Sequence, residues 1–398
     1  MLRTISTAVL HAIQGVLDQG PDASPPALAA GVKALSEGFT KSRPLCGRRY
    51  LDQPDLLPAY LTYYLPVNLA KVQSLLDELP GDTLTRQASA PLRLLDVGSG
   101  PGTASLALLD WLVRRNAEGV AVSAEACDHS PAALAIAKTL WDLYAHRQGI
   151  QSARFTARGI NLERTADLRA LCSSVTERFH LVCLANSLNE LFGTARNPVE
   201  RRCQVVLRLL DVLRPDGSLI IVEPALRDLT RDLHRLRDLL TRNNVCTLYS
   251  PCLHEDGCPA LHHPEDWCHE ERAWAPPAEI RRLDREVGFI KDSLKFSYLI
   301  LRKDGRTVVP RARNVFRIVS ERREFKGETR LWTCSETGRL EVGRLDRERS
   351  ASNAEFDQVE RGAIMRWVQP DHTVLQEGRG RIHRVRPEDL IAIERLGG

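Results

Sequence analysis

Residues 94–105 read LLDVGSGPGTAS, an apolar run that passes through three glycines into a helical pattern. Gly98, Gly100 and Gly102 allow the backbone to turn sharply and to approach a ligand closely, and the helix that follows offers free amide donors at its first turn. Dinucleotide-binding domains use the same device, so the turn alone does not choose the ligand. The stretch predicts a strand–turn–helix unit that holds a small molecule at the edge of a sheet.

Strands and helices alternate on both sides of this turn. Buried strands are expected at residues 93–98, 120–128, 153–161, 179–187 and 217–226, with helical segments between them. Alternation of this kind implies a parallel sheet that is covered on both faces. The expected fold class is α/β, a Rossmann-like sheet of the class I methyltransferase type, with a helical N-terminal region, a Cys-rich insertion and a small C-terminal β domain.

Polar residues at the strand ends favour S-adenosylmethionine over a nicotinamide cofactor. Asp96 lies inside the glycine motif, where methyltransferases hold the methionine amino group, and Asp128 ends the second strand, where its carboxylate can accept both ribose hydroxyls. Leu184, Ala185 and Asn186 end the fourth strand, beside the expected reactive methyl, and LRPDGSLIIVEP (213–224) has the usual turn-then-strand form. The predicted cofactor contacts are Asp96, Gly98, Ser99, Gly100, Gly102, Thr103, Asp128, Leu184 and Asn186.

No catalytic group can be assigned from the sequence. The fourth strand ends in Ala185, Asn186, Ser187, Leu188, Asn189 and Glu190, which is not the Asn/Asp-Pro-Pro-aromatic pattern of amino-methylating nucleic-acid enzymes. Cys183 is preceded by Val182 rather than by proline, against cytosine C5 chemistry. Glu190 or Asn189 could serve as a base or could cap a helix, and transfer activity stays open.

Composition and patterning suggest three domains. The 398 residues are 43% hydrophobic and 27% charged, and no apolar run is long enough to span a membrane. We expect a helical region at 1–88, an S-adenosylmethionine-binding domain at 89–304 with an insertion at 224–277, and a β-rich domain at 305–398. The N-terminus reads as a helix rather than as a presequence, which favours a bacterial-type cytoplasmic protein over one of the mitochondrial matrix.

Ten cysteines are many for such a chain. Cys252, Cys258 and Cys268 gather in a loop rich in proline and histidine, where thiolates can converge on one metal or cluster. A fourth ligand is needed; we select Cys334, and Cys246, His254 and His269 compete with it. The spacing is not that of a zinc ribbon, so zinc and an iron–sulfur cluster both remain open.

Several segments together resemble a known family. LLDVGSGPGT, ANSLNEL, VEP, SPCLHEDGCPAL and DWCHEERAW are similar to the ribosomal small-subunit methyltransferase-like family, which includes mitochondrial methyltransferase-like protein 17 and bacterial relatives. The resemblance runs from about Leu51 to the C-terminal tail. It implies a factor that binds the small ribosomal subunit and its ribosomal RNA during assembly or translation, and a [4Fe–4S] cluster on Cys252, Cys258, Cys268 and Cys334.

The resemblance also gives a role to a basic connector. Between residues 301 and 330, ten Lys or Arg stand against four Asp or Glu; on charge alone this could be a solvated face. The resemblance implies that Arg311, Arg313, Arg317, Arg322 and Arg323 face phosphates. The alternatives are an active RNA or protein methyltransferase with a structural zinc or iron–sulfur site, and a radical enzyme, which the absence of a CxxxCxxC loop disfavours. We expect a monomer off the ribosome.

Overall fold

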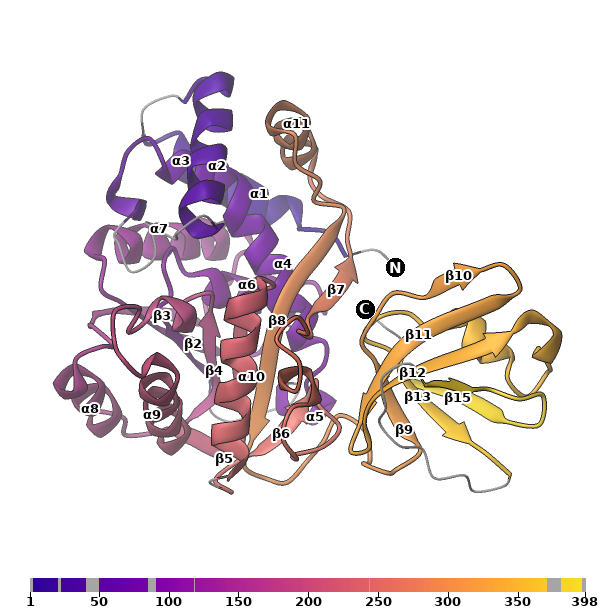
Figure 1. Cartoon of the computed structure of the whole chain (residues 1–398). Helices are drawn as coiled ribbons and strands as arrows, with labels where there is room; N and C mark the ends of the chain where they lie inside the picture. The colour runs from indigo at the N-terminus through magenta and orange to yellow at the C-terminus, as the bar shows by residue number, and fades with distance from the viewer. Residues whose placement is uncertain are drawn as a thin grey trace. The chain divides into compact units, whose positions relative to one another are not determined.

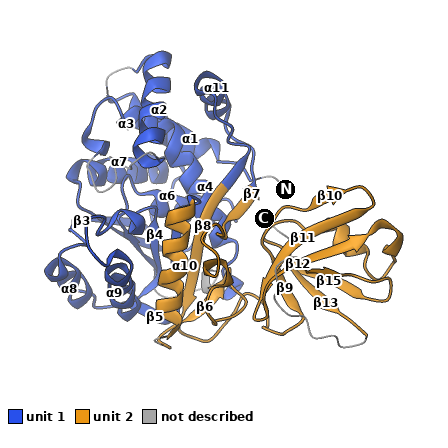
Figure 2. Cartoon of the chain, in the orientation of Figure 1, with its two compact units in different colours: residues 1–226, 273–294 blue, residues 227–272, 295–398 orange. Residues whose placement is uncertain are grey.

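The computed structural model describes residues 3–20, 23–40, 50–84, 91–117, 119–242, 244–370 and 381–395. The chain divides into two compact units (Figure 2): unit 1 comprises residues 1–226 and 273–294, and unit 2 comprises residues 227–272 and 295–398. This division differs from the three predicted domains, because most of the predicted insertion groups with the C-terminal strands. Among the described residues, no helix has the length and apolarity that crossing a membrane requires.

Unit 1 begins with helices, as predicted (Figure 1). Ser6 caps the first of them, because its Oγ accepts a hydrogen bond from the Val9 amide at 3.2 Å. A π-helical turn interrupts the series at Tyr60–Tyr64, a backbone irregularity that is frequent at functional sites. The elements are α1 (Thr7–Leu17), α2 (Pro25–Thr40), η1 (Tyr50–Asp52), α3 (Leu57–Ala59), η2 (Tyr60–Tyr64), α4 (Leu65–Leu76) and α5 (Gly81–Leu84).

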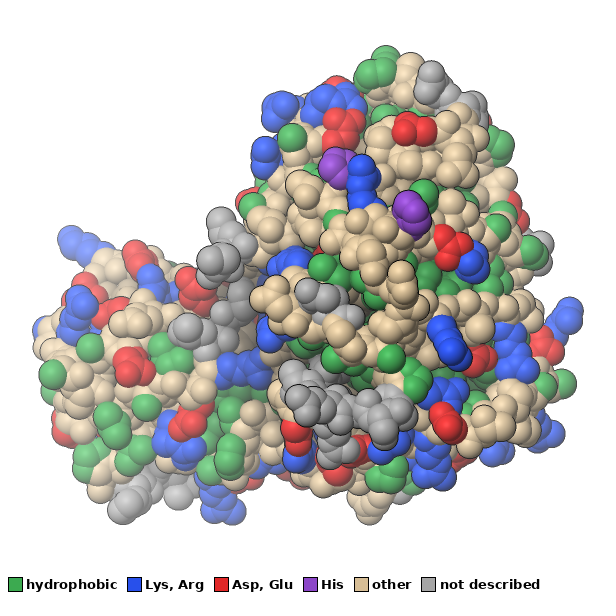
Figure 3. All heavy atoms as spheres, turned by 180° about the vertical axis from the view of Figure 1, so that it is seen from behind, with side chains coloured by type: hydrophobic (Ala, Val, Ile, Leu, Met, Phe, Trp, Pro, Cys, Tyr) green, Lys and Arg blue, Asp and Glu red, His purple; other side chains and the backbone are tan. Residues whose placement is uncertain are grey.

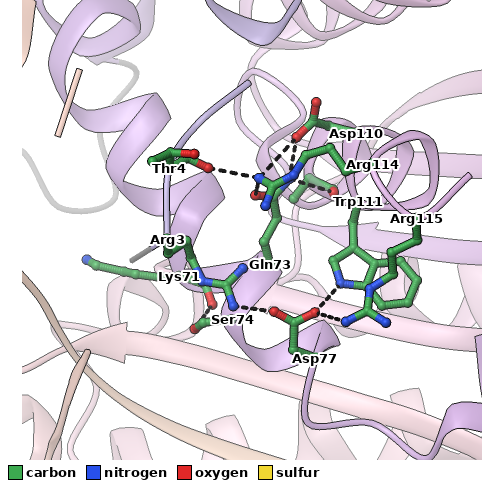
Figure 4. Close-up of polar contacts among 11 residues, drawn as sticks. Arg3, Thr4, Lys71, Gln73, Ser74, Asp77, Asp110, Trp111, Arg114 and Arg115 are labelled. Atoms are coloured by element: carbon green, nitrogen blue, oxygen red, sulfur yellow. Dashed lines mark hydrogen bonds and ion pairs between the residues drawn. The ribbon is translucent and has the colours of Figure 1, made fainter. Parts of the chain in front are cut away.

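A polar network fixes the start of the chain to α4 and to α6 (Thr103–Val113) (Figure 4). Asp77 pairs with Arg3 and accepts hydrogen bonds from Trp111 Nε1 at 2.7 Å and from Arg115 at 2.6 Å. Arg114 donates to the Thr4 carbonyl at 2.8 Å. The N-terminal helices are therefore part of the same packed unit as the sheet.

The sheet of unit 1 is parallel. Its strand order is β3-β2-β1-β4-β5, and Leu94 of β1 lies between Ala124 of β2 and Leu181 of β4. The order reverses between β1 and β4, and such a switch point opens a crevice at the carboxyl ends of the strands. The strands are β1 (Leu92–Val97), β2 (Val122–Asp128), β3 (Ala153–Gly159), β4 (Phe179–Ala185) and β5 (Leu213–Pro224). The remaining elements of this unit are α6, α7 (Pro131–Arg147), α8 (Thr165–Ser173), η3 (Leu188–Glu190), α9 (Pro198–Asp211) and α11 (Ala278–Val287).

Unit 2 combines the Cys-rich segment with the C-terminal strands. Strand β8 (Ser293–Arg302) pairs in antiparallel fashion with β6 (Thr247–Ser250), and it also pairs with β7 (Glu270–Ala273). The same unit contains α10 (Arg227–Arg242) and η4 (Pro259–Leu261). A second sheet has the order β14-β12-β11-β9-β13-β15, with β10 on β11, around a core that includes Phe316, Phe356 and Trp367. Its strands are β9 (Val315–Ile318), β10 (Arg323–Phe325), β11 (Glu328–Ser335), β12 (Gly338–Leu345), β13 (Ile364–Val368), β14 (Ile382–Arg384) and β15 (Leu390–Arg395); η5 (Asp346–Glu348) and η6 (Ala354–Gln358) connect them.

Candidate functional site

A cavity of about 160 Å³ lies in unit 1 where β1, β2 and β4 end. It is the crevice that the switch in strand order predicts. Six of the nine predicted contact residues line it: Gly98, Ser99, Gly100, Thr103, Asp128 and Asn186. Asp96, Gly102 and Leu184 do not line it.

The glycines of the turn adopt the conformation that their type permits. Gly98, Gly100 and Gly102 have φ values of +62°, +50° and +79°. A Cβ on Gly98 would lie 2.4 Å from the Cβ of Ser187, and one on Gly102 would lie 3.0 Å from the Cβ of Ala137 in α7. Gly98 therefore permits the close approach of β1 and the segment after β4, and Gly102 permits the packing of the turn on α7.

Asp128 is held in place by backbone donors. Its Oδ2 accepts the Gly100 amide at 2.8 Å and its Oδ1 accepts the Ser130 amide at 2.9 Å, while His129 Nδ1 lies 3.4 Å from Oδ1. Burial raises the pKa of Asp128, but the hydrogen bonds from His129, Ser130 and Gly100 outweigh burial and lower it. An ionised carboxylate at a cavity wall suits a ligand that offers hydroxyl donors.

Asp96 is buried and does not line the cavity. Its Oδ2 accepts the Ser105 amide at 2.9 Å and the Ser105 hydroxyl at 2.8 Å, which fixes the first turn of α6 to β1. Its Oδ1 is buried without a hydrogen-bond partner. Burial raises the pKa of Asp96 to about 7. The second oxygen thus has unused hydrogen-bonding capacity beside the glycine turn.

The segment after β4 forms the opposite wall. Asn186 adopts a left-handed conformation with φ +59°, and its amide donates to the Val222 carbonyl at 2.7 Å. Leu184 is fully buried in the strand, whereas Glu190 lines the cavity. The Asn189 amide donates to Glu223 Oε1 at 3.2 Å, so this residue stabilises the turn.

Other cavity residues were not identified from the sequence. Tyr50 and Tyr60 reach the cavity from the N-terminal helices, and Asn161 and Glu163 reach it from the segment after β3. The position after a parallel strand could have indicated Asn161, because strand ends meet at one edge of the sheet. Nothing in the local pattern indicates the tyrosines. Burial, as the largest cause, raises the pKa of Tyr60 to about 12.

The four predicted metal ligands share a second cavity, which lies in unit 2. Cys252, Cys258, Cys268 and Cys334 all line it, at a volume of about 60 Å³. Burial raises the pKa of each of Cys258, Cys268 and Cys334, and in each case charge on Cys252 raises it further; Cys268 reaches about 11. Thiols from three segments of sequence are thus near neighbours. Across the described ranges, no group of three or more His, Cys, Asp or Glu is arranged to hold a metal ion.

The competing fourth ligands are placed differently from one another. His254 and His269 line the cysteine cavity, and Cys246 is buried but does not line it. His254 Nε2 lies 3.7 Å from Cys334 Sγ. Cys334 and His254 are therefore neighbours in the same cavity.

The basic connector does not present one continuous charged face. Arg317 is 5% exposed, pairs with Glu270 and donates to the Tyr298 hydroxyl at 3.0 Å, so the expectation that it faces phosphates is wrong. The exposed Arg313 pairs with Glu336 at 3.1 Å. Arg311, Arg322 and Arg323 pair with Glu255, Glu324 and Glu341. On the face drawn in Figure 3, basic and acidic side chains are likewise interspersed.

The parallel sheet with the order 3-2-1-4-5, the glycine turn and the cavity beside it define an S-adenosylmethionine-dependent methyltransferase fold of class I. A family model matches residues 56–350, and the chain belongs to that family, which is described as mitochondrial small ribosomal subunit Rsm22. The search of the curated proteins returned no match.

Solved methyltransferases are similar to the chain at low identity. They include a sugar N-methyltransferase, KedS8, from Streptoalloteichus (16% identity, 39% of this chain and 47% of that one, TM-score 0.24), of whose length the match spans about half. A TehB-like S-adenosylmethionine-dependent methyltransferase from Corynebacterium glutamicum has 14% identity, with 70% and 99% covered and a TM-score of 0.28. An O-methyltransferase from Bacillus cereus has 12% identity, with 76% and 94% covered and a TM-score of 0.36.

Proposed function

We propose that the chain binds S-adenosylmethionine in the cavity of unit 1 and acts with the small ribosomal subunit. The observation that carries the first part is the placement of Asp128. Its ionised carboxylate lines the cavity and is held by Gly100 and Ser130 amides at 2.8 and 2.9 Å, so it is already oriented to accept the ribose hydroxyls. The predicted contact set remains part of this proposal, with Asp96 acting from beneath the turn.

Ligand-induced stabilisation tests this binding. A ligand that binds only the folded state raises the free energy of unfolding by about 2.7 kcal/mol at a hundredfold excess over its Kd. S-adenosylmethionine and S-adenosylhomocysteine should both raise the melting temperature, and NAD should not. Stabilisation by NAD alone would contradict the proposal.

Cys252, Cys258, Cys268 and Cys334 are proposed to hold a [4Fe–4S] cluster, with zinc as the alternative. The donor set fits, because four thiols line one cavity and Arg237 and Arg339, which also line it, can offset thiolate charge. The cluster would cross-link the Cys-rich segment, which holds Cys252, Cys258 and Cys268, to β11, which holds Cys334, and its role would be structural.

Elemental analysis distinguishes the two metals. Anaerobic purification should give about four irons and four sulfides per chain with a broad absorption band near roughly 400 nm. One zinc without iron would support the alternative. A chain free of both metals would remove the metal site from the proposal and leave the cofactor cavity unaffected.

The family supplies the proposed partner, the small ribosomal subunit with its ribosomal RNA. Among the connector arginines, the exposed Arg313 is the best placed for phosphate contacts. The chain should co-sediment with small subunits or their precursors, with an affinity that falls as salt rises. Equal co-sedimentation with large subunits would contradict this partner. The cytoplasmic location and the monomeric state remain predictions.

Methyl transfer is the second candidate activity. Glu190 and Asn186 line the cavity after β4, where a carboxylate could accept a proton from a methyl acceptor. If the chain is an enzyme, S-adenosylhomocysteine should accumulate with small-subunit precursors and this should stop in Asp128→Ala. If assembly survives that substitution, the cavity serves structure rather than transfer.

A further inference from the structure

Two histidines contact the cysteine cavity without being among the four proposed ligands. His234 of α10 places Nδ1 3.5 Å from Cys258 Sγ. His254, in the loop between β6 and η4, places Nε2 3.7 Å from Cys334 Sγ. Both rings are at least nine-tenths buried and line the cavity. Each ring has a second polar partner, and these second partners decide where the proton lies.

The second partner of His254 is Arg237. Its guanidinium lies 3.5 Å from His254 Nδ1 and donates to the His254 carbonyl at 2.6 Å. A guanidinium has no acceptor, so this contact is a hydrogen bond only when Nδ1 is the unprotonated nitrogen of the neutral ring. The proton is then on Nε2, the nitrogen that faces Cys334. This tautomer does not depend on whether a metal is bound.

The second partner of His234 is the backbone of Cys268. His234 Nε2 lies 3.3 Å from the Cys268 amide nitrogen and 3.2 Å from its carbonyl oxygen. A metal-bound thiolate carries no proton and can only accept. With Cys258 ligated, Nδ1 therefore donates to Sγ, and Nε2 is left to accept the Cys268 amide. This neutral tautomer satisfies the Sγ and amide contacts, and it leaves the Cys268 carbonyl without a hydrogen bond from Nε2.

We propose that His234 and His254 are positioning residues that donate N–H hydrogen bonds to the ligand sulfurs of Cys258 and Cys334, from Nδ1 and Nε2 respectively. The proposal rests on the proposed cysteine site. Hydrogen bonds to ligand sulfur offset thiolate charge, which strengthens retention of the group and raises its reduction potential. They also attach two of the four ligands to α10 and Arg237.

Amide substitutions test the assignment one nitrogen at a time. An Asn amide reaches the position of Nδ1, and a Gln amide reaches that of Nε2. His234→Asn and His254→Gln should therefore retain iron and potential close to those of the unsubstituted chain. His234→Gln and His254→Asn should lose iron to a chelator roughly 10- to 100-fold faster, with a more negative potential. His262→Asn is the matched control, because His262 is exposed and outside the cavity lining.

The outcomes separate this inference from the site on which it rests. If the Asn and Gln variants behave alike at each position, the histidines only pack against the cavity and the assignment is overturned. If His254→Gln loses the iron while Cys334→Ser keeps it, His254 is itself a ligand and the assignment is also overturned. If the unsubstituted chain holds no iron, the proposed cysteine site fails. The ¹⁵N chemical shifts of the imidazole nitrogens then decide which nitrogen of His254 carries the proton. A proton on Nε2 of His254 supports the assignment there, and one on Nδ1 overturns it.

Discussion

Gly98 and Ser187 meet where β1 and β4 end, and their backbones lie so close that a Cβ on Gly98 would stand 2.4 Å from the Cβ of Ser187. The Ser187 hydroxyl also donates to the Val97 carbonyl at 2.9 Å. This contact joins the glycine turn to the opposite wall of the proposed cofactor cavity, so the shape of the cavity depends on the absence of a side chain at position 98.

Gly98→Ala should therefore damage both the fold and the cavity. We expect a loss of about 1–3 kcal/mol in the free energy of unfolding, because a non-glycine residue is forced to a positive φ and against Ser187. S-adenosylmethionine affinity should fall at least tenfold. Urea unfolding and calorimetry measure the two effects. Gly119→Ala, where a Cβ would meet nothing within 4 Å, is the control; equal losses in both variants would contradict the steric argument.

The sequence predicted the parts of this site that follow from local pattern. A glycine at a strand end and an acid at the next strand end have positional meaning in a parallel sheet, which is why Gly98, Gly100 and Asp128 could be placed before the fold was known. Leu184 shows the limit of that reasoning, because strand alternation alone did not reveal that its side chain points into the sheet.

Contacts between residues far apart in the sequence determine the placements that the sequence did not predict. Tyr60 reaches the cavity because the N-terminal helices pack on the sheet unit, and no spacing within 60–64 signals that approach. Arg317 looked like part of a basic surface, yet its pairing with Glu270, 47 positions earlier, draws it into the interior. By contrast, Cys252, Cys258 and Cys268 were expected to lie together because they share one Pro-rich loop, and Cys334, selected as the fourth ligand with the support of the family resemblance, lines the same cavity.

Lys71 predicts an unusual pH dependence of stability. Burial, aided by Lys291 and opposed by Glu223, lowers its pKa to about 7, against about 10.4 in the unfolded chain. Between these values the unfolded state binds the proton and the folded state does not, so this group makes stability rise with pH over that window. Lys71→Met should stabilise the chain by about 1–3 kcal/mol near neutral pH.

The advantage of Lys71→Met should shrink as pH rises from about 7 toward about 10, because deprotonating this lysine, which folding requires, then costs progressively less free energy. Urea midpoints at about pH 7 and about pH 9.5 measure this trend. Lys138→Met is the control, since Lys138 of α7 is exposed and pairs with the equally exposed Asp142. A gain that stays constant with pH would count against the buried-charge explanation.

Arg317 and Arg313 lie on the same segment and should differ sharply. Arg317→Ala leaves Glu270 with a buried carboxylate that has lost one of its partners, so we expect a loss of about 3–5 kcal/mol in the free energy of unfolding. Arg313→Ala should change it by no more than about 0.5 kcal/mol, because its side chain is 87% exposed. Chemical denaturation compares them, and similar losses would show that Arg317 is not buried as described.

Cys252→Ser should remove a ligand from the cysteine cavity. We expect loss of iron or zinc, a lower melting temperature and weaker association with small subunits, because unit 2 loses its cross-link. Cys172→Ser is the matched control, since Cys172 lies in α8, outside the cavity lining, and its Sγ donates to the Arg208 carbonyl at 3.5 Å, a contact that a serine hydroxyl can also make. Unchanged metal content and melting in Cys252→Ser would refute the ligand set.

The most direct measurement is calorimetric titration of the chain with S-adenosylmethionine, with Asp128→Asn and the exposed Asp142→Asn alongside. We expect one site per chain and no change of affinity in Asp142→Asn. In Asp128→Asn the affinity should fall by roughly 10- to 100-fold, since a charge-assisted hydrogen bond is worth about 1.5–3 kcal/mol. Binding of equal strength in all three chains would place the cofactor elsewhere, and no binding in the unsubstituted chain would show that the cavity does not hold S-adenosylmethionine.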